Sequence, residues 1–206
     1  MKENKVDIIL NSAEELMCTM EEPNRDITVD MIAKNAGIGK GSIYYYFESK
    51  DEIIDAVIER SYSNAIKEYF AATEKSHATT VDKLKELFRS IIRKEFTDKS
   101  KNVIIALHMQ DDNFLHYKMM MTAIRTVSPI LTKILTEGRK KGDVRTDAPK
   151  ESAEMIVAML TFLLDRSLFP SDDRSIYFKL KIYAKVLETS LETEKGIFDF
   201  LFTPEK

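Results

Sequence analysis

The sequence has 206 residues, of which 44% are hydrophobic and 32% are charged, and its formal net charge is −3. This balance is typical of a globular chain that can bury a core, and the slight excess of acid argues against a protein that coats nucleic acid indiscriminately. The single cysteine, Cys18, excludes an internal disulfide and a zinc site built only from cysteines.

The composition also excludes a membrane protein and favours helices. The apolar runs are far too short to span a bilayer, and the opening residues MKENKVD lack the apolar stretch of a signal peptide. We therefore predict a cytoplasmic protein with no membrane partner. Glycine and proline are scarce, and Leu, Ile, Ala, Lys, Glu and Met recur at helical spacing, which indicates an all-α fold.

The first two predicted helices lie close together in the chain. Apolar residues spaced three and four apart predict a helix over residues 3–21, which stops before Pro23. Thr28 is a suitable N-cap for a short second helix. Gly37 ends that helix, because glycine adopts the left-handed conformation at little cost.

The third predicted helix covers residues 38–47. Ser49 and Glu52 then match a capping box that opens a longer helix over about residues 50–70. Beyond it, amphipathic patterns predict further helices, over roughly 81–97, 100–111, 113–141, 149–169 and 173–195.

These elements divide the chain into two predicted domains. A three-helix head occupies residues 1–49, and a helical body occupies residues 50–206. The first helix of the body links the two. We therefore expect an all-α protein in which a small head precedes a larger helical domain.

The second and third helices, joined by a tight turn at Gly37, match the pattern of a helix-turn-helix. In that motif the second helix lies in the DNA major groove with its first residues at base edges. Ile43 and Phe47 are four residues apart and should face the core, which leaves the polar and aromatic residues on the outer faces: Lys40, Ser42, Tyr44, Tyr45 and Tyr46. Tyrosine hydroxyls can donate hydrogen bonds to phosphate oxygens, so this surface suits DNA.

Lys50 stands in the first turn of the following helix, where backbone N–H groups and the positive end of the helix dipole attract anions. A lysine is electrostatically unfavourable there unless a phosphate is its neighbour. Residues 31–47 also hold Lys34 and Lys40 but no acidic residue. These features indicate a focused DNA contact, and the alternative is that Lys50 and the tyrosines only cover the surface.

The stretch TVDMIAKNAGIGKGSIYYYFESKDEIIDAVI resembles the N-terminal DNA-binding domain of TetR-family (tetracycline-repressor-like) transcriptional regulators. A second stretch, LTKILTEGRKKGDVRTDAPKESAEMIVAML, is similar to part of the family's ligand-binding body. Gly39 departs from the pattern, because the family usually has Ser or Ala there. The resemblance implies phosphate contacts from Thr28, Tyr44, Tyr46 and Lys50, and places Lys40, Gly41, Ser42 and Tyr45 nearest the bases.

The resemblance also implies a homodimer that binds a near-palindromic double-stranded DNA operator and is released by a small-molecule effector. Repression is the commoner outcome in the family, and activation stays open. The family dimerises through its last two long helices, where apolar stripes supply the candidates Ile156, Leu160, Leu163, Leu164, Leu180, Tyr183 and Leu187. The alternative is that these stripes face the core of their own subunit.

Methionine and aromatic residues populate the middle helices of the body. Methionine adapts its shape, so such a lining suits a pocket for a hydrophobic or aromatic effector. The pocket candidates are Phe88, His108, Phe114, Tyr117, Met121, Met159 and Phe162. The alternative is that these side chains form an ordinary soft core.

A second cluster of polar residues could hold a divalent metal. On one unbroken helix its members would share a face, at i, i+3, i+4 and i+8: His108, Asp111, Asp112 and His116. A predicted helix boundary at Asn113 splits this set, so a solvated loop is favoured and we expect no metal and no cofactor.

Two other classes of function compete with a regulator. An enzyme is not expected, because the common catalytic and nucleotide-binding motifs do not occur in the sequence. The other alternative is a protein-binding or metal-responsive helical protein with a degenerate DNA-binding head, supported only by the acidic residues near the N-terminus and by Gly39. The sequence therefore predicts a DNA-binding regulator.

Overall fold

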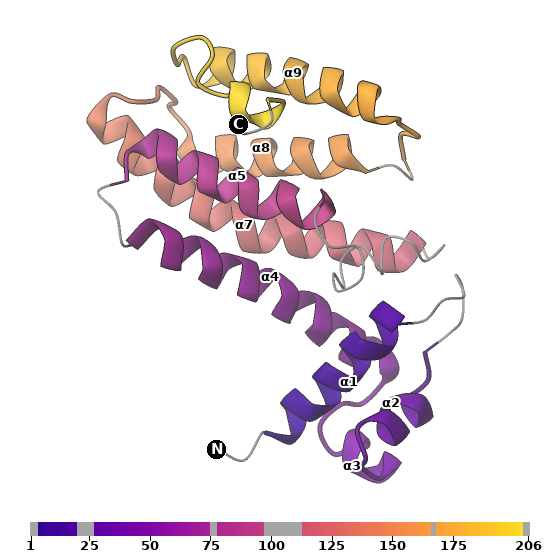
Figure 1. The fold of residues 1–206 in the computed structure, drawn as a ribbon. Coiled ribbons are helices and arrows are strands. Elements are labelled where there is room, and N and C mark those ends of the chain that lie inside the picture. Colours follow the sequence, from indigo (N-terminus) through magenta and orange to yellow (C-terminus); the bar gives the residue numbers. More distant parts are fainter. Residues whose placement is uncertain (1–3, 20–26, 75–77, 97–112, 166–167, 204–206) are drawn as a thin grey trace. The chain divides into compact units, whose positions relative to one another are not determined.

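The computed structural model describes residues 4–19, 27–74, 78–96, 113–165 and 168–203. All the regular elements in these ranges are helices, so the predicted all-α fold is confirmed (Figure 1). They are α1 (Lys5–Thr19), α2 (Val29–Asn35), α3 (Lys40–Tyr44), α4 (Lys50–Glu74), α5 (Thr80–Phe96), α7 (Asn113–Lys141), α8 (Pro149–Leu164), α9 (Asp173–Ser190) and the short 3₁₀ helix η1 (Asp199–Leu201).

The chain forms two compact units that divide inside α4, α5 and α7. The first unit holds the chain up to Asn64 together with Arg93–Met119, and the second holds Ala65–Ile92 and the chain from Met120 onward. The domain boundary predicted at residue 49 stays a prediction. The compact units part later, after Asn64, because the start of α4 belongs to the core of the head.

The core of the first unit is built from one face of each of its helices. Ile9 of α1, Ile32 of α2 and Ile43 of α3 are all 0% exposed. Ile53 of α4 and Met119 of α7 belong to the same cluster. Burying side chains of this size stabilises the fold by about 1.5–3 kcal/mol each, so α4 cannot be separated from the head without a large loss.

Two ion pairs join α4 to other helices of the first unit. The guanidinium of Arg60 lies 2.8 Å from the carboxylate of Glu14 on α1, and both side chains are partly buried. The ammonium of Lys118, near the start of α7, lies 2.9 Å from the carboxylate of Asp55. These contacts fix the orientation of α4 relative to α1 and to the first turns of α7.

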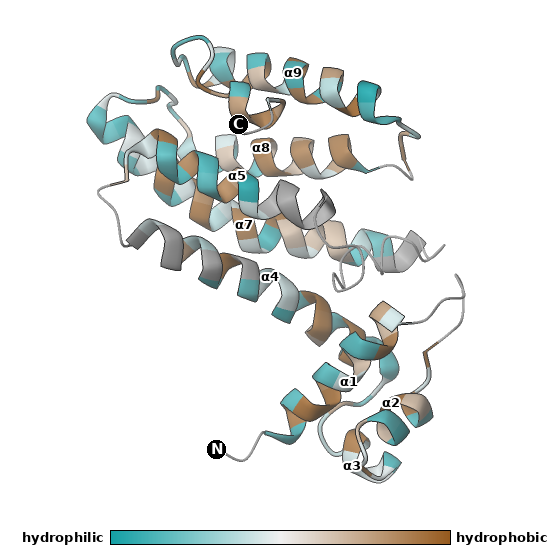
Figure 2. Ribbon diagram, in the orientation of Figure 1, coloured by the Kyte–Doolittle hydropathy of each residue, from teal (hydrophilic) through white to brown (hydrophobic). Residues whose placement is uncertain are grey.

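The second unit is a helical bundle with a larger core. Within it α8 lies alongside α9, and η1 packs on α9 (Figure 1). Hydrophobic residues run along α8 (Figure 2). Tyr183 of α9 is 2% exposed, and its hydroxyl donates a 2.7 Å hydrogen bond to the Ile156 carbonyl of α8. Burial raises the pKa of this phenol, so it stays a hydrogen-bond donor.

Helix α5 begins against the end of α7 through a close contact at Gly138. A methyl group on Gly138 would lie 2.6 Å from the Cγ2 atom of Thr80. The Thr80 hydroxyl donates to the Asp143 carboxylate at 2.6 Å. Glycine is therefore required where these two segments cross.

The predicted ends of several helices differ from those observed. α8 ends at Leu164 and α9 at Ser190, earlier than the sequence pattern indicates. The helix predicted over residues 100–111 lies outside the described residues. None of the described helices is long and apolar enough to cross a membrane.

Candidate nucleic-acid interface

The turn between α2 and α3 is fixed by hydrogen bonds at both ends of α2. The Thr28 hydroxyl caps α2 by accepting from the Met31 backbone N–H at 3.3 Å. At the other end the Gly37 N–H donates to the Lys34 carbonyl at 3.3 Å, and the Ile38 N–H donates to the Ala33 carbonyl at 3.0 Å. With Gly37 at φ 65°, this is a Schellman motif, which stops α2 and turns the chain toward α3.

Helix α3 is shorter than predicted, because it runs from Lys40 to Tyr44 rather than over residues 38–47. Gly39 occupies the N-cap with extended backbone and offers no side chain to cap the helix. A glycine at this position removes a capping hydrogen bond that Ser could supply. α3 starts only at Lys40 because Gly37 and Ile38 belong to the turn that closes α2. Phe47 still reaches the core with 7% exposure.

The three tyrosines after α3 begins lie on the surface, as their spacing predicts. Tyr45 is 81% exposed, Tyr44 50% and Tyr46 37%. The rings of Tyr45 and Tyr46 meet edge to face, with their centroids 4.9 Å apart. Ile43, the residue just before them, is fully buried, so α3 is anchored by this side chain while the tyrosines face outward.

Lys40 is paired across the turn, a contact that sequence reasoning missed. Its ammonium donates to the Asp30 carboxylate of α2 at 2.7 Å. The hydrogen bond that Lys40 donates to Asp30 raises the pKa of Lys40; desolvation opposes this rise, and the charge of Asp30 adds to it. Asp30 lies ten residues before Lys40, and no periodic pattern marks that distance. The pair holds the first side chain of α3 against α2.

The remaining predicted DNA contacts lie at helix starts of the same unit. Thr28 is exposed at the start of α2, and Lys50 is the first residue of α4. The α4 start is capped, because the Ser49 hydroxyl accepts from the Glu52 N–H at 3.2 Å. The Glu52 carboxylate accepts from the Glu48 N–H, whereas the predicted capping box has it accept from the Ser49 N–H.

Gly41 leaves the front of α3 open. A methyl group added there would meet no protein atom within 4 Å, and the same holds at Gly39. Neither glycine is needed for packing within the chain. The absence of a side chain at Gly41 lets another molecule approach the helix backbone closely.

The described residues that are predicted to line an effector pocket differ widely in exposure. Phe88 is 2% exposed and packs on Tyr183 and Phe198 in the core. Tyr117, Met159 and Phe162 are 59%, 39% and 45% exposed, and Met121 is partly buried. His108 and the side chain of Phe114 lie outside the described residues.

Two of the cavities lined by described residues lie in the second unit, and none of the described candidates lines either of them. One, of about 740 Å³, lies between α7 and α8 and is lined mainly by apolar atoms. The other, of about 450 Å³, lies among α4, α5 and α7 and carries lysines. On α7, Lys133, Glu137 and Lys141 recur every four residues, a signal in the sequence that could have indicated this surface.

Most of the predicted dimer contacts are buried inside their own subunit. Six of them are 7% exposed or less: Ile156, Leu160, Leu164, Leu180, Tyr183 and Leu187. Leu163 is partly buried against the same core. These side chains pack within their own subunit, as the alternative interpretation of the stripes expects, so their place in a dimer interface stays a prediction. The exposed apolar residues of the same helices are Met155, Met159, Phe162, Tyr177, Phe178, Ile182 and Val186.

The possible metal cluster falls largely outside the described residues, because His108, Asp111 and Asp112 precede α7. His116 lies on α7 and is partly buried. In the described part of the chain, no group of three or more His, Cys, Asp or Glu side chains is arranged to hold a metal ion.

Two family models match the chain in the order of its two units. The model for bacterial regulatory proteins of the tetR family matches residues 9–57, which include α2, α3 and the start of α4. The model for the tetracyclin repressor-like C-terminal domain matches residues 96–186. The first match covers the outward surface described above.

Curated relatives match over part of their length. The chain is 28% identical over 121 residues to the fatty acid metabolism regulator protein of Bacillus subtilis, covering 57% of this chain and 60% of the relative. It is 30% identical over 83 residues to the nucleoid occlusion factor SlmA of Actinobacillus pleuropneumoniae, covering 40% of each. It is 39% identical over 57 residues to the HTH-type transcriptional regulator EthR of Mycobacterium tuberculosis, covering 28% of this chain and 26% of EthR. The chain thus spans less than two thirds of the length of these relatives.

Solved structures match over nearly the whole chain. SmeT, the repressor of the Stenotrophomonas maltophilia multidrug efflux pump SmeDEF, gives a TM-score of 0.63 at 19% identity and covers 100% of this chain and 96% of SmeT. RolR in complex with resorcinol gives 0.67 at 16%, covering 98% and 95%. FadR of Bacillus halodurans gives 0.63 at 20%, covering 94% and 100%. At these identities the likeness shows a shared fold.

Proposed function

This chain belongs to the TetR family of bacterial regulatory proteins, and from that premise we propose that it represses transcription by binding a near-palindromic DNA operator as a homodimer. A small molecule bound in the second unit releases the operator. The observation that carries this proposal is the outward surface of the head, where Lys40, the bare backbone at Gly41 and the exposed tyrosines lie on α3 and the two residues after it.

The chemistry of that surface supports sequence-specific binding. The exposed phenols can donate to phosphate oxygens or pack against sugars, and Lys50 adds a cation at a helix start. Lys40 and Ser42 lie on α3, which in a helix-turn-helix enters the major groove. We assign positioning contacts to Thr28, Tyr44, Tyr46 and Lys50, and base contacts to Lys40, Gly41, Ser42 and Tyr45.

A dimer is needed because a palindromic operator requires two heads related by a two-fold axis. We place the interface on the exposed apolar faces of α8 and α9. On α8, Met155, Met159 and Phe162 follow one another at helical spacing. On α9, Ile182 is 63% exposed and stands between Phe178 and Val186 at the same spacing. Exposed apolar faces of this extent are typical of protein interfaces.

The proposal is tested by selecting DNA from a random duplex pool with the purified chain at two salt concentrations. We expect an inverted repeat to be enriched and its affinity to fall with salt, in proportion to the phosphates contacted. Enrichment of a single half-site alone would contradict the dimer. No enrichment at either salt would favour the alternative of a protein-binding or metal-responsive chain with a degenerate head.

A pair of variants then tests the site. Lys50→Ala should weaken binding to every sequence and lower the salt dependence by about one phosphate contact. Lys5→Ala removes the same charge from exposed α1 and should leave binding unchanged. Equal losses in the two variants would show that only the overall charge matters, and the role given to Lys50 would fall.

A further inference from the structure

The smaller cavity of the second unit is open to solvent and is formed by three helical segments. It has a volume of about 450 Å³, within the range of small-molecule sites. The end of α4 contributes Tyr69, Phe70 and Thr73, and the region where α5 begins contributes Lys83. The far wall is one face of α7, because the residues that line it recur at helical spacing: Ile130, Lys133, Ile134, Glu137 and Lys141.

The charged side chains that line the cavity do not neutralise one another. Three ammonium groups, those of Lys83, Lys133 and Lys141, line the cavity with one carboxylate, that of Glu137. Lys83 takes up this carboxylate, since its Nζ atom lies 2.7 Å from Oε2 of Glu137. Among the residues that the structure describes, no carboxylate makes an ion pair with Lys133 or Lys141. The cavity therefore has a net positive lining.

The three lysines of the cavity also favour the charged form of Glu137. The hydrogen bond from Lys83 lowers the pKa of Glu137, and the charges of Lys83, Lys133 and Lys141 lower it further. Glu137 is thus ionised at neutral pH and forms its ion pair with Lys83. It cannot neutralise the other two lysines as well.

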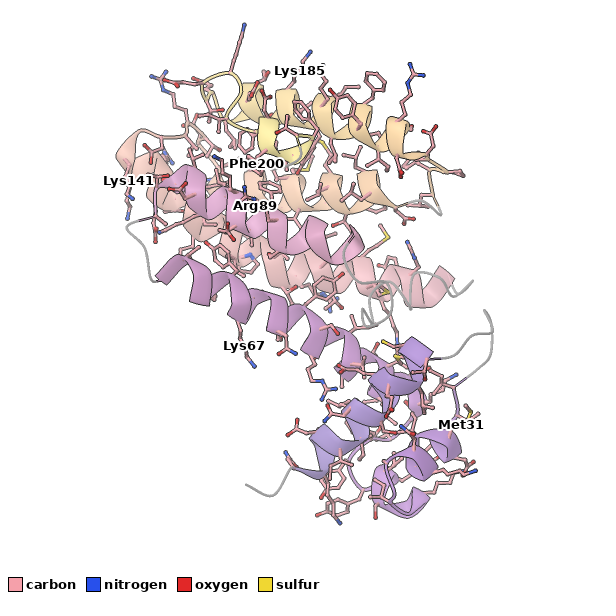
Figure 3. All side chains as sticks on the ribbon, viewed as in Figure 1. Met31, Lys67, Arg89, Lys141, Lys185 and Phe200 are labelled. Atoms are coloured by element: carbon pink, nitrogen blue, oxygen red, sulfur yellow. The ribbon has the colours of Figure 1, made fainter. Side chains whose placement is uncertain are left out.

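Lys141 lies at the C-terminal end of α7 (Figure 3), where the helix dipole alone favours a cation. That effect accounts for a lysine in the last turn. It does not account for Lys133, two turns earlier, or for the apolar surface beside them. Tyr69 and Ile134 are 4% and 3% exposed, and Phe70 is 37% exposed at the cavity edge. Cations and apolar side chains thus share one concave surface.

We propose that this cavity binds an amphipathic organic anion, whose carboxylate or phosphate group meets Lys133 and Lys141 and whose apolar part lies against Phe70 and Ile130. The inference rests on the proposed function, because it names the chemical class of effector that the regulator senses. It adds an anionic group to the hydrophobic or aromatic effector expected from the sequence. Neutral molecules of the same length lack the charge that the lysines recognise.

The experiment measures binding of matched eight-carbon probes to the full chain by calorimetry at low salt. Octanoate and octyl phosphate carry the two anionic groups, and octanol and octylammonium carry neutral and positive ones. We expect one or both anions to bind with a Kd below about 1 mM and the other two probes not to bind. The stronger of the two anions identifies the headgroup. Equal binding of octanol, or no binding of either anion, overturns the proposal.

Two variants locate the site. Lys133→Ala combined with Lys141→Ala should weaken binding of the anion about tenfold, because two exposed attractive charges are removed. Lys140→Ala is the matched control, since Lys140 is exposed on the same helix and does not line the cavity. If the double variant and wild type bind equally, the anion binds elsewhere and the proposal is wrong.

Operator binding is measured separately, without any probe. Failure to bind DNA removes the proposed function but leaves the probe result as the test of the cavity. Binding of an anion that leaves the operator affinity unchanged contradicts the effector role of this cavity. If the anion releases the operator from wild type and from Lys140→Ala but not from the double variant, the result supports both the proposed function and the effector role of this cavity.

Discussion

The Lys40 ammonium lies 2.7 Å from the Asp30 carboxylate, so the first side chain of α3 is held by the helix before it. Both side chains are largely exposed, so solvent screens the pair and DNA phosphates can compete for the lysine. Asp30 itself brings a negative charge to the surface that we assign to DNA. It therefore acts against binding in two ways, by occupying Lys40 and by repelling phosphate.

Asp30→Asn should tighten binding to all duplexes by about threefold to tenfold, because it releases Lys40 and removes one repulsive charge. The measurement is a titration of operator and unrelated DNA at two salt concentrations. Asp7→Asn makes the same charge change at an exposed position of α1. An equal gain in Asp7→Asn would mean that net charge alone is responsible and that the pair with Lys40 has no role.

Gly41→Ala should separate folding from DNA binding. The added methyl meets no neighbouring side chain or distant backbone atom within 4 Å, and alanine favours helix. The free energy of unfolding measured in urea should therefore rise by about 0.5–1 kcal/mol. Operator affinity should fall by about tenfold or more, because the methyl occupies the space nearest the bases. Gly39→Ser, which restores the residue common in the family, should keep its affinity. Unchanged affinity in Gly41→Ala would remove this glycine from the interface.

The head could be predicted well from sequence because its signals are local. The N-cap at Thr28, the glycine stop at Gly37 and the buried Ile43 each depend on residues a few positions away, and each occurs in the structure. α3 starts late because Gly37 and Ile38 are used in the turn that closes α2. The pair of Asp30 with Lys40 could not be predicted locally, because it depends on the tertiary angle between α2 and α3.

The body was less predictable because its helices are apolar on more than one face. On α8 the residues Ile156 and Leu160 pack inward, while Met155 and Met159 face out, and both pairs are spaced four apart. Periodicity identifies such faces but not which of them the same subunit covers. A cavity among three separate segments depends on their packing, which the spacing within one helix does not contain.

Ile182→Glu should convert the proposed dimer to a monomer. A carboxylate placed on this exposed apolar face would be buried without a partner at the interface, a change that typically costs several kcal/mol. Sedimentation velocity measures the oligomeric state, and operator affinity should fall when the dimer is lost. Ser63→Glu adds the same charge at an exposed position of another helix, α4, and should remain dimeric. A dimeric Ile182→Glu chain would place the interface elsewhere.

Gly138→Ala should destabilise the second unit by about 1–3 kcal/mol, because the new methyl would lie 2.6 Å from Cγ2 of Thr80. Thr80→Ser removes that carbon and keeps the hydroxyl that donates to Asp143. The double variant should therefore be more stable than Gly138→Ala alone, although Thr80→Ser by itself removes a buried methyl. Urea unfolding of wild type, the two single variants and the double variant gives the coupling free energy between the two positions. Additive losses of unfolding free energy would show that a methyl group on Gly138 does not clash with Thr80.

Tyr183 should make the stability of the protein depend on pH in alkaline solution. Burial raises the pKa of this phenol, so above about pH 10 the unfolded chain loses a proton that the folded chain keeps. The contribution is complete at lower pH and declines by up to about 1.4 kcal/mol per pH unit above that point. Tyr183→Phe loses the hydrogen bond to the Ile156 carbonyl, which should cost about 0.5–1.5 kcal/mol at neutral pH. It also loses the titrating group. The unfolding free energies of the two chains should therefore converge as the pH rises past 10, and parallel curves would mean that Tyr183 ionises as readily in the folded chain as in the unfolded one.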